Sequence, residues 1–508
     1  MAMFERGYSM TTQENLKLFH DWVKRMSAYH MALALLGIDK QTLAPVDGSE
    51  FRDERMAILA GELFSITTDP RMAELRKTLL SDEAVTGDDR KMIELYDHDI
   101  SKILSVPKDE YVAFNQLQNE SYGAWLKAKN ASDYSMFEPY LKRIIEAQKK
   151  MYSYRSSDLD LYDQMLDDFE PGMTREKYDV FFDKVKERLV PLIRRVTEAE
   201  QIDTSFIETE YPVELQKKYM EHMLAYLHFD KSWGYQNETE HPFTSGLCEN
   251  DIRVTTKYLP DRPMSALLST IHETGHGYYM HQVAPEYDGT IFNEGVSSGM
   301  HESQSRLCEN YLGRSKPFWE ANYPALKEVF PEQLKDIGLD QFLAALNAAQ
   351  PSLIRTEADE LTYPLHIVIR YELERGLFEG TISTEGLDKT WDDMYEKYLG
   401  VRASSAKEGI LQDVHWADGS FGYFPTYALG SAFSAQFMHA MRKDIDVDDL
   451  LRNSHYDVIM NWLKEHIHKY GCRYNADEIM HMATGEAFDP NYYLDYLEDK
   501  YTKLYHLD

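Results

Sequence analysis

The sequence predicts an all-α protein that is predominantly helical and contains at most one small β-sheet. In long stretches the apolar residues recur every three or four positions, as in 136–154, where they form one face between lysines and glutamates. Few stretches alternate with period two, the pattern of a half-buried strand. The 508 residues include only 18 prolines and 26 glycines, so long disordered tracts are not expected.

Helical periodicity occurs in several parts of the chain: 16–36, 56–63, 136–154, 178–196, 213–227, 352–378 and 489–507. Pro364 lies inside one of these ranges and predicts a kink there. The range 252–258 is a candidate short strand. An edge strand at that place would suit a protein that binds extended peptides, because the peptide could pair with it. We find no linker or internal repeat, so residues 1–508 are predicted to form a single domain.

Another helix is predicted to begin near residue 261. Asp261 can cap it, and Pro263 suits its first turn. Apolar residues then repeat at helical spacing from Met264 to Ile271. This stripe should face the core and place the residues that follow it at the core's edge.

That helix carries the pentapeptide His-Glu-Thr-Gly-His at 272–276, which fits the HExxH pattern of zinc peptidases. His272 and His276 are four residues apart, so both rings can reach one metal ion. Glu273 can then act as general base toward a water on the zinc. The alternative is a helix with two structural histidines, and the rest of the sequence must decide between the two.

A catalytic zinc takes three protein ligands and keeps one open position. The range 283–295 has the composition of a loop, and 296–312 returns to the helical pattern, which could bring Glu302 against the histidine pair. His301 competes for this role, but on a helix its side chain points about 100° away from that of Glu302. Glu294, in the loop, is a weaker competitor. Glu302 is therefore predicted as the third ligand.

Six short motifs occur in one order along the chain. They are His241-Pro242-Phe243 (HPF), Asp251-Ile252-Arg253-Val254-Thr255 (DxRxT), His272-Glu273-Thr274-Gly275-His276 (HExxH), His301-Glu302-Ser303-Gln304 (HES-Q), Ile354-Arg355-Thr356-Glu357-Ala358-Asp359 (IRxxAD) and Gly409-Ile410-Leu411-Gln412-Asp413-Val414-His415-Trp416 (GxxQDxHW). With this series the sequence resembles the carboxypeptidase Taq family of zinc metallocarboxypeptidases. Residues 1–235 carry no matching motif and are expected to form an N-terminal helical lobe, with 236–508 as the catalytic part.

The resemblance implies a helical zinc-peptidase fold with a deep substrate groove between lobes. It also implies an enzyme that removes single C-terminal residues from peptides with a free C-terminus. One zinc ion per chain is the expected cofactor, which cobalt or manganese can replace. The resemblance further implies a homodimer.

Three residues near the last motif are candidates to donate a hydrogen bond to the oxyanion of the transition state: His415, Tyr423 and Tyr427. Similar zinc peptidases place a His and a Tyr from such a segment over the metal. Gly419 and Gly422 lie between them and could make the segment flexible. The alternative for each tyrosine is ordinary packing in the core.

An exopeptidase of this kind must bind the free carboxylate at the end of its substrate, and arginine does so with two parallel hydrogen bonds. Arg355 is the first choice and Arg253 the second. Both have a structural alternative, because Arg355 could pair with Asp359 and Arg253 with Asp251. His241 could bind the substrate backbone or merely set the turn before the next proline.

Zinc-bound histidines usually donate their second ring N–H to a carboxylate or a carbonyl. Some zinc peptidases place that carboxylate four residues after the ligand glutamate, where this chain has Arg306. That arrangement is therefore absent, and Asp359 and Glu309 are the remaining candidates.

Composition restricts the partners and the compartment. The net charge of −32 would repel nucleic acid. Three cysteines without CxxC spacing are typical of a reducing compartment. The N-terminal residues show no signal-peptide pattern, and nowhere do eighteen apolar residues run together. A cytoplasmic protein without a membrane span is expected.

Three other functions remain open. A di-iron protein could use Glu273 and His276 with a second Glu-x-x-His pair, Glu478 and His481. A non-catalytic peptide-binding protein on the same scaffold is disfavoured because the base Glu273 is present. A dipeptidyl carboxypeptidase or an oligopeptidase would share the helical groove and the HExxH chemistry.

Overall fold

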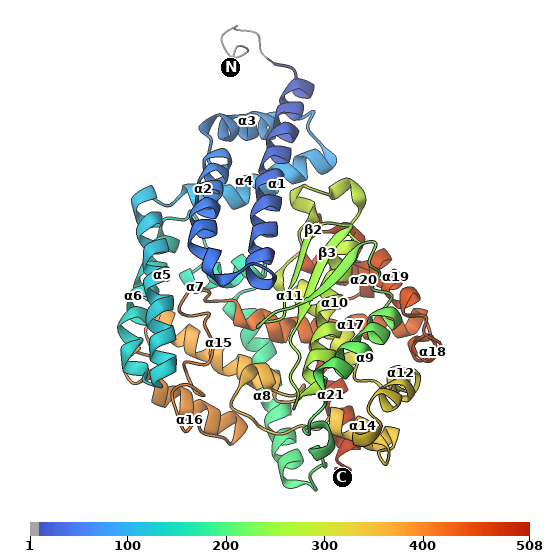
Figure 1. The fold of residues 1–508 in the computed structure, drawn as a ribbon. Coiled ribbons are helices and arrows are strands. Elements are labelled where there is room, and N and C mark those ends of the chain that lie inside the picture. Colours follow the sequence, from blue (N-terminus) through green and yellow to red (C-terminus); the bar gives the residue numbers. More distant parts are fainter. Residues whose placement is uncertain (1–9, 508) are drawn as a thin grey trace.

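The structure, a computed structural model, describes residues 10–507 (Figure 1). Nine α-helices precede the sheet in this part of the chain: α1 (Thr12–Thr42), α2 (Ser49–Thr67), α3 (Pro70–Ser81), α4 (Gly87–Leu104), α5 (Lys108–Ala131), α6 (Glu138–Ser153), α7 (Leu161–Phe169), α8 (Arg175–Glu198) and α9 (Val213–Tyr226). The predicted helical character of the N-terminal part is confirmed. α1, α2 and α8 extend beyond their predicted ranges, and α6 and α9 end within two residues of theirs.

The remaining elements lie in the part of the chain that contains the motifs. They are β1 (Gly234–Glu238), β2 (Thr244–Cys248), β3 (Asp251–Thr256), α10 (Pro263–His281), α11 (Ser298–Arg306), a π-helix (Leu307–Leu312), α12 (Lys316–Val329), α13 (Pro331–Leu334), α14 (Leu339–Leu346), α15 (Tyr363–Glu379), α16 (Leu387–Leu399), α17 (Phe424–Asp444), α18 (Val447–Arg452), α19 (Tyr456–His466), α20 (Ala476–Thr484) and α21 (Asn491–Leu504). The fold is thus all-α apart from one three-stranded sheet, as predicted.

The sheet has the strand order β1-β3-β2, with β1 parallel and β2 antiparallel to β3. The predicted strand at 252–258 is real, but it lies in the middle of the sheet rather than at an edge. The pattern of one strand does not reveal its neighbours, and β3 is paired on both sides here. The edge strand that packs against α10 is β2 (Figure 1).

Helix α10 begins at Pro263, the position at which a missing N–H does no harm. The predicted cap is wrong, because Arg262 and not Asp261 precedes the first helical residue, and no side chain caps this end. The predicted apolar stripe is confirmed, with Leu267 and Ile271 buried. This stripe ties α10 to the core and fixes the direction of the histidines that follow it.

Helix α15 begins at Tyr363, so Pro364 lies in its first turn and produces no kink. Proline is tolerated there because the first N–H groups of a helix have no partner within the helix. The residues from 352 to 362 are irregular instead, with a short 3₁₀ turn at Arg355–Glu357. The residues of the IRxxAD motif therefore lie in a loop that leads into α15.

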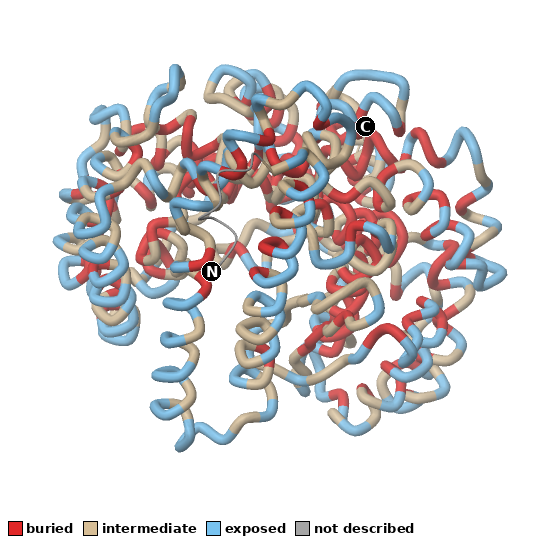
Figure 2. Tube along the Cα trace, turned by 90° about the horizontal axis from the view of Figure 1, so that it is seen from above, coloured by how far each residue is buried: buried red, intermediate tan, exposed pale blue. Residues whose placement is uncertain are grey.

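Buried residues are concentrated in the centre of the molecule (Figure 2). The larger core includes residues from Leu117 to Tyr505, and it runs across the proposed lobe boundary at residue 235. A smaller core joins α1–α4 with Tyr287 and Phe292 from the loop after α10. Within residues 10–507, none of the helices has both the length and the apolar character that crossing a membrane would require.

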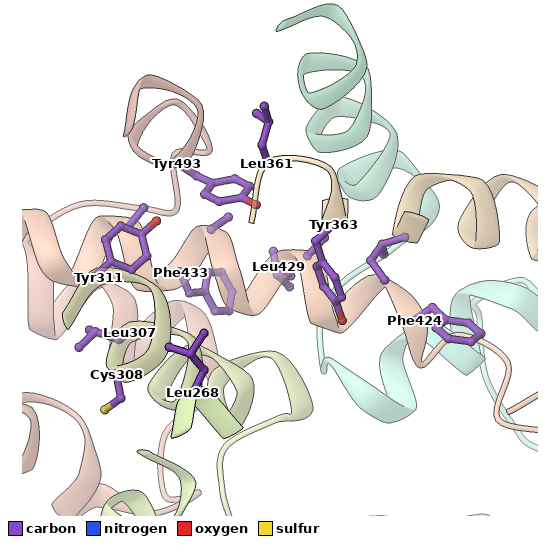
Figure 3. Packing of buried hydrophobic residues seen from close by; sticks show 14 of the residues in the cluster. Leu268, Leu307, Cys308, Tyr311, Leu361, Tyr363, Phe424, Leu429, Phe433 and Tyr493 are labelled. Carbon is purple, nitrogen blue, oxygen red and sulfur yellow. The ribbon is translucent and has the colours of Figure 1, made fainter. Parts of the chain in front are cut away.

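The helices that carry the HExxH and HES-Q motifs meet in the larger core. Figure 3 shows Leu268 of α10, Leu307 and Cys308 of the π-helix, and Leu429 and Phe433 of α17 in one cluster. α11 packs against both α10 and α17. Two motifs that are separate in the sequence, HExxH and HES-Q, are therefore held face to face.

Candidate metal centre and active site

One set of histidine, cysteine, aspartate and glutamate side chains in residues 10–507 could hold a metal: His272, His276 and Glu302. Their ligand atoms all lie within 4.8 Å of one another. Glu302 Oε2 is 3.7 Å from His272 Nε2 and 3.5 Å from His276 Nε2. The three residues predicted as ligands are therefore brought together, with both Nε2 atoms directed at the same oxygen.

Close approach of α10 and α11 produces this arrangement, and Gly275 permits it. A Cβ at this position would lie 2.7 Å from Gln304 O and 2.8 Å from Ser305 Cα. Any larger residue would push the two helices apart and move Glu302 away from the histidines. The glycine inside the HExxH pentapeptide is thus a requirement of helix packing.

The second nitrogen of His272 has a carboxylate partner. His272 Nδ1 lies 2.9 Å from Oε2 of Glu309, which belongs to the π-helix that continues α11. Burial raises the pKa of Glu309, but Arg306 and His272 lower it more strongly, to about 2. Of the two candidates for this role, Glu309 makes the contact. Asp359 instead accepts hydrogen bonds from its own loop, at Leu361 N and Thr362 N.

The second nitrogen of His276 faces another histidine. His276 Nδ1 lies 2.6 Å from His301 Nδ1, so His301 is not in the ligand cluster but supports it from behind. Burial and the neighbouring His276 lower the pKa of His301 to about 3, and the ring is neutral at pH 7. If His276 Nδ1 carries the hydrogen of this pair, its Nε2 keeps a lone pair for a metal.

Arg306 holds the carboxylate of Glu302 from the other side. Its Nε donates to Glu302 Oε1 at 2.6 Å, and its guanidinium lies over the ring of Tyr363. Burial raises the pKa of Glu302, but Arg306 and the histidines lower it well below its usual range. In the sequence, Arg306 stands where some zinc peptidases have a carboxylate, and its contact with Glu302 is not predicted. Its spacing of one helical turn from Glu302 was the available signal.

The candidate base Glu273 is buried, with an exposed fraction of 7%. Thr244, at the start of β2, donates from its hydroxyl toward Glu273 Oε2 at 2.6 Å. The sequence does not single out Thr244, although it directly follows the HPF motif.

Arg355 is buried, and its partner is Asp413. Arg355 Nη2 lies 2.9 Å from Asp413 Oδ1, and Arg370 Nε lies 2.7 Å from Asp413 Oδ2. The structural alternative with Asp359 is therefore wrong, because Asp359 points into its own loop. Two guanidinium groups share one carboxylate, which leaves a net charge of about +1 on this cluster at neutral pH. Arg370, on α15, stands outside all six motifs, so the sequence did not reveal it.

His415, Tyr423 and Tyr427 lie together next to this cluster. The ring centroids of Tyr423 and Tyr427 are 5.1 Å apart, and those of His415 and Tyr423 are 5.6 Å apart. The centre of the Arg355 guanidinium is 5.1 Å from the ring of Tyr427. Burial, with Glu302 adding to it, raises the pKa of Tyr423. Burial also raises the pKa of Tyr427, so both tyrosines keep their protons at neutral pH.

Burial also lowers the pKa of His415 to about 4, an effect that Asp413 opposes and the two arginines increase. Its Nδ1 is buried and has no hydrogen-bond partner among the described residues. A neutral ring with an unused nitrogen can donate to or accept from a substrate.

Three possible metal ligands beside a buried glutamate fit a metal-dependent peptidase. The comparison with known proteins identifies the peptidase family. The family described as Carboxypeptidase Taq (M32) metallopeptidase matches residues 18–501. The chain belongs to this family. It is therefore a metallocarboxypeptidase, and its substrates are peptides.

Relatives and solved structures cover nearly the whole metallocarboxypeptidase. It is 42% identical to Carboxypeptidase 1 of Bacillus subtilis, over 96% of this chain and 98% of that protein. It is 37% identical to Thermostable carboxypeptidase 1 of Thermus thermophilus, over 95% of this chain and 97% of that protein. The crystal structure of the M32 carboxypeptidase from Deinococcus radiodurans R1 superposes with a TM-score of 0.94 at 33% identity, covering 97% of this chain and 100% of that one.

Two residues of this metallocarboxypeptidase that are predicted to bind substrate lie apart from Arg355 and the two tyrosines. Arg253, on β3, forms the predicted structural pair with Asp251, at 2.7 Å. His241 is exposed before the start of β2. Glu294, the weaker competitor for the third ligand, is not in the ligand cluster.

Gly419 and Gly422, which could make their segment flexible, lie in a segment with several hydrogen bonds to other elements. Both glycines have positive φ angles of 81° and 86°. Gly422 N donates to Glu374 Oε2 at 2.8 Å, and Trp416 Nε1 donates to Glu374 Oε1 at 2.7 Å. Gln148 donates to the carbonyl of Gly419. The glycines thus serve a fixed backbone shape that L-residues rarely adopt.

The alternative di-iron site is not formed. Glu478 and His481 are exposed on α20, and Glu478 accepts a hydrogen bond from Asn475 N as part of a capping box. A di-iron site would require these side chains to project into a bundle core. The family assignment excludes this interpretation as well.

Proposed function

We propose that this metallocarboxypeptidase is a zinc enzyme that removes single C-terminal residues from peptides. The convergence of His272 Nε2, His276 Nε2 and Glu302 Oε2 beside the buried Glu273 is the observation that supports it most directly. Two nitrogen ligands and one oxygen ligand form a donor set typical of catalytic zinc, with one position left open.

The residues fit a single zinc ion per chain. Both histidines turn Nε2 toward Glu302, and their Nδ1 atoms have partners in Glu309 and His301. Such partners fix the ring orientation of metal-binding histidines. A zinc ion held there would supply Lewis acidity toward water and the peptide carbonyl, and cobalt or manganese could occupy the same ligands.

Glu273 is proposed to take a proton from the attacking water and to pass it to the amine of the leaving residue. Tyr423, Tyr427 and His415 are proposed to donate to the oxygen that becomes negative during attack. Their partly buried positions support this role, because a hydrogen bond to a developing charge is stronger where water is excluded.

Arg355 is proposed to bind the carboxylate at the substrate's C-terminus. Asp413 neutralises only one of the two positive charges contributed by Arg355 and Arg370. A buried cluster with an excess positive charge favours an anion that enters it. Arg253 and His241 stay weaker candidates for substrate binding. Asp251 balances the single positive charge of Arg253 and leaves no excess charge to attract a carboxylate.

Glu273→Gln tests the proposed base. Glutamine keeps the shape of glutamate but cannot accept a proton, so kcat should fall about 100- to 10,000-fold while zinc stays bound. His272→Ala and Glu302→Ala should instead lose the metal. The measurements are peptide hydrolysis and metal content by mass spectrometry. A Glu273→Gln enzyme with unchanged kcat would disprove the mechanism.

Arg355→Ala tests the anchor. Turnover of a peptide with a free C-terminus should fall about 100-fold or more, while cleavage of its C-terminally amidated form, which lacks the charge, should change little. Arg402→Ala is the matched control, because Arg402 makes surface ion pairs with Asp393 and Glu396. An equal loss on both peptides would refute the anchoring role.

A second candidate function is a dipeptidyl carboxypeptidase or an oligopeptidase with the same cluster. Mass spectrometry of an unblocked peptide during digestion separates them. A ladder of products, each shorter by one C-terminal residue, is expected for the proposed function. Losses in pairs or internal cuts would assign the second.

We also propose a cytoplasmic homodimer that does not bind nucleic acid. The dimer is carried over from the family resemblance. All three cysteines are free, which fits a reducing compartment. The net charge of −32 argues against nucleic acid as a partner. Sedimentation equilibrium of the purified protein would test the dimer.

A further inference from the structure

Thr244 makes two close contacts with the candidate base. Its hydroxyl lies 2.6 Å from Glu273 Oε2 and 2.8 Å from Glu273 O. A hydroxyl has a single hydrogen, so it donates to one of these atoms at a time, and a carboxylate oxygen is the stronger acceptor. The edge strand β2 is thereby tied through a side chain to the catalytic helix α10.

We propose that Thr244 is a positioning residue that fixes the carboxylate of Glu273 for catalysis, and that Thr255 holds Thr244 in place. The inference rests on the proposed function, in which Glu273 is the base. With Oε2 engaged by Thr244, Oε1 is the oxygen available to the attacking water. A glutamate has three side-chain torsions, and a hydrogen-bonding partner reduces the orientations it can adopt.

Thr255 fixes the residue directly before Thr244. Its hydroxyl accepts from Phe243 N at 2.8 Å and donates to Phe243 O at 3.0 Å. Thr255 N also donates to Phe243 O, at 2.9 Å. Thr255 itself is buried, with an exposed fraction of 1%. Three hydrogen bonds therefore determine the backbone at the point where β2 begins.

This chain of contacts gives the HPF and DxRxT motifs a common purpose. Phe243 is the last residue of the first motif, and Thr255 is the last of the second. Arg253, in the same DxRxT motif, is occupied by Asp251. Both motifs are thereby connected to the candidate base through Thr244.

The test uses the zinc-loaded full-length enzyme. Thr244→Val removes the hydroxyl and keeps the branched shape, so kcat should fall about 10- to 100-fold with KM and zinc content unchanged. Thr244→Ser, which keeps the hydroxyl, should restore most of kcat. In a crystal structure of the zinc-loaded Thr244→Val protein, Glu273 should occupy more than one rotamer. Wild-type kcat in Thr244→Val would overturn the proposal.

Thr256→Val is the matched control. Thr256 is buried on the same sheet and donates to Ala266 O in α10 at 3.1 Å, away from Glu273. This variant should lower thermal stability without changing kcat. An equal loss of kcat in Thr256→Val would show that any weakened contact between sheet and helix suffices, and would also overturn the proposal.

Two further variants separate the possible failures. Thr244→Val combined with Glu273→Gln should be no slower than Glu273→Gln alone, because Thr244 acts through Glu273. An inactive Glu273→Gln together with a fully active Thr244→Val would reject this inference and leave the proposed function intact.

If Thr244→Val does not fold, Thr244→Ala removes the same hydroxyl with less bulk. Wild-type kcat in Thr244→Ala counts equally against the proposal.

Discussion

At the scale of single residues, the two histidines of the cluster differ in what supports them. His272 is backed by the carboxylate of Glu309, and His276 by the neutral ring of His301. An anionic partner makes the imidazole a stronger ligand than a neutral partner does. Glu309 also contacts Arg306 and Arg314, so its negative charge is well compensated in the interior.

We therefore predict that Glu309→Gln weakens zinc binding about 10- to 100-fold. Glutamine keeps the size of the side chain but removes the charge that supports His272. Competition with a chelator at pH 7 would measure the change. Glu328→Gln, on the exposed face of α12, is the control and should bind zinc as the unmodified enzyme does. A Glu309→Gln protein with undiminished affinity would mean that the contact does not tune the ligand.

At the scale of elements, α15 and the segment before α17 behave as one unit. Glu374 of α15 accepts hydrogen bonds from Trp416 Nε1, Gly422 N and the hydroxyl of Tyr162. The segment that carries His415 and Tyr423 is thereby fixed to α15. Burial raises the pKa of Glu374 to about 7, although these hydrogen bonds oppose the shift.

The raised pKa predicts a pH dependence of stability. Between pH 4.5 and 7 the unfolded chain releases the proton of Glu374 while the folded protein keeps it. The free energy of unfolding should therefore fall by about 3 kcal/mol as the pH rises through this range. Glu374→Gln cannot titrate and should lack this part of the dependence, although it will be less stable overall.

The comparison is made by denaturant unfolding of both proteins at several pH values. Other buried acids such as Glu170, whose pKa is raised to about 7, titrate in both proteins and cancel in the difference. Parallel curves for the two proteins would contradict the assignment of this effect to Glu374.

At the scale of the whole molecule, the ligand cluster joins separate parts of the fold. His272 and His276 come from α10 and Glu302 from α11, which in turn packs on α17. A metal that binds this cluster binds only the folded protein, so it must stabilise the fold.

We predict that removing zinc lowers Tm by several degrees. At a zinc concentration about 1,000 times Kd, the bound metal stabilises the folded state by about 4 kcal/mol. Calorimetry with and without a chelator would measure the shift. The same experiment on His272→Ala should show almost no shift. A shift of equal size in that variant would mean that the stabilising metal binds elsewhere.

Much of the candidate site could be predicted from local rules. The period of a helix is enough to place His272 and His276 on one face. The turn of about 100° per residue is enough to point His301 and Glu302 in different directions. The helical fold class follows from apolar periodicity, which is visible in any single segment. In these cases the residues that matter are neighbours along the chain.

The remaining features depend on contacts between distant segments, which no local pattern encodes. Arg355 meets Asp413 rather than Asp359, and Thr244 meets Glu273, because packing brings loop, strand and helix together. The position of β3 in the centre of the sheet depends on two partners that lie elsewhere in the sequence. The sequence by itself determined the helices, the motif order and the chemistry of the ligands. Only the tertiary structure decided which side chains support them, since burial and partner choice arise when the elements pack.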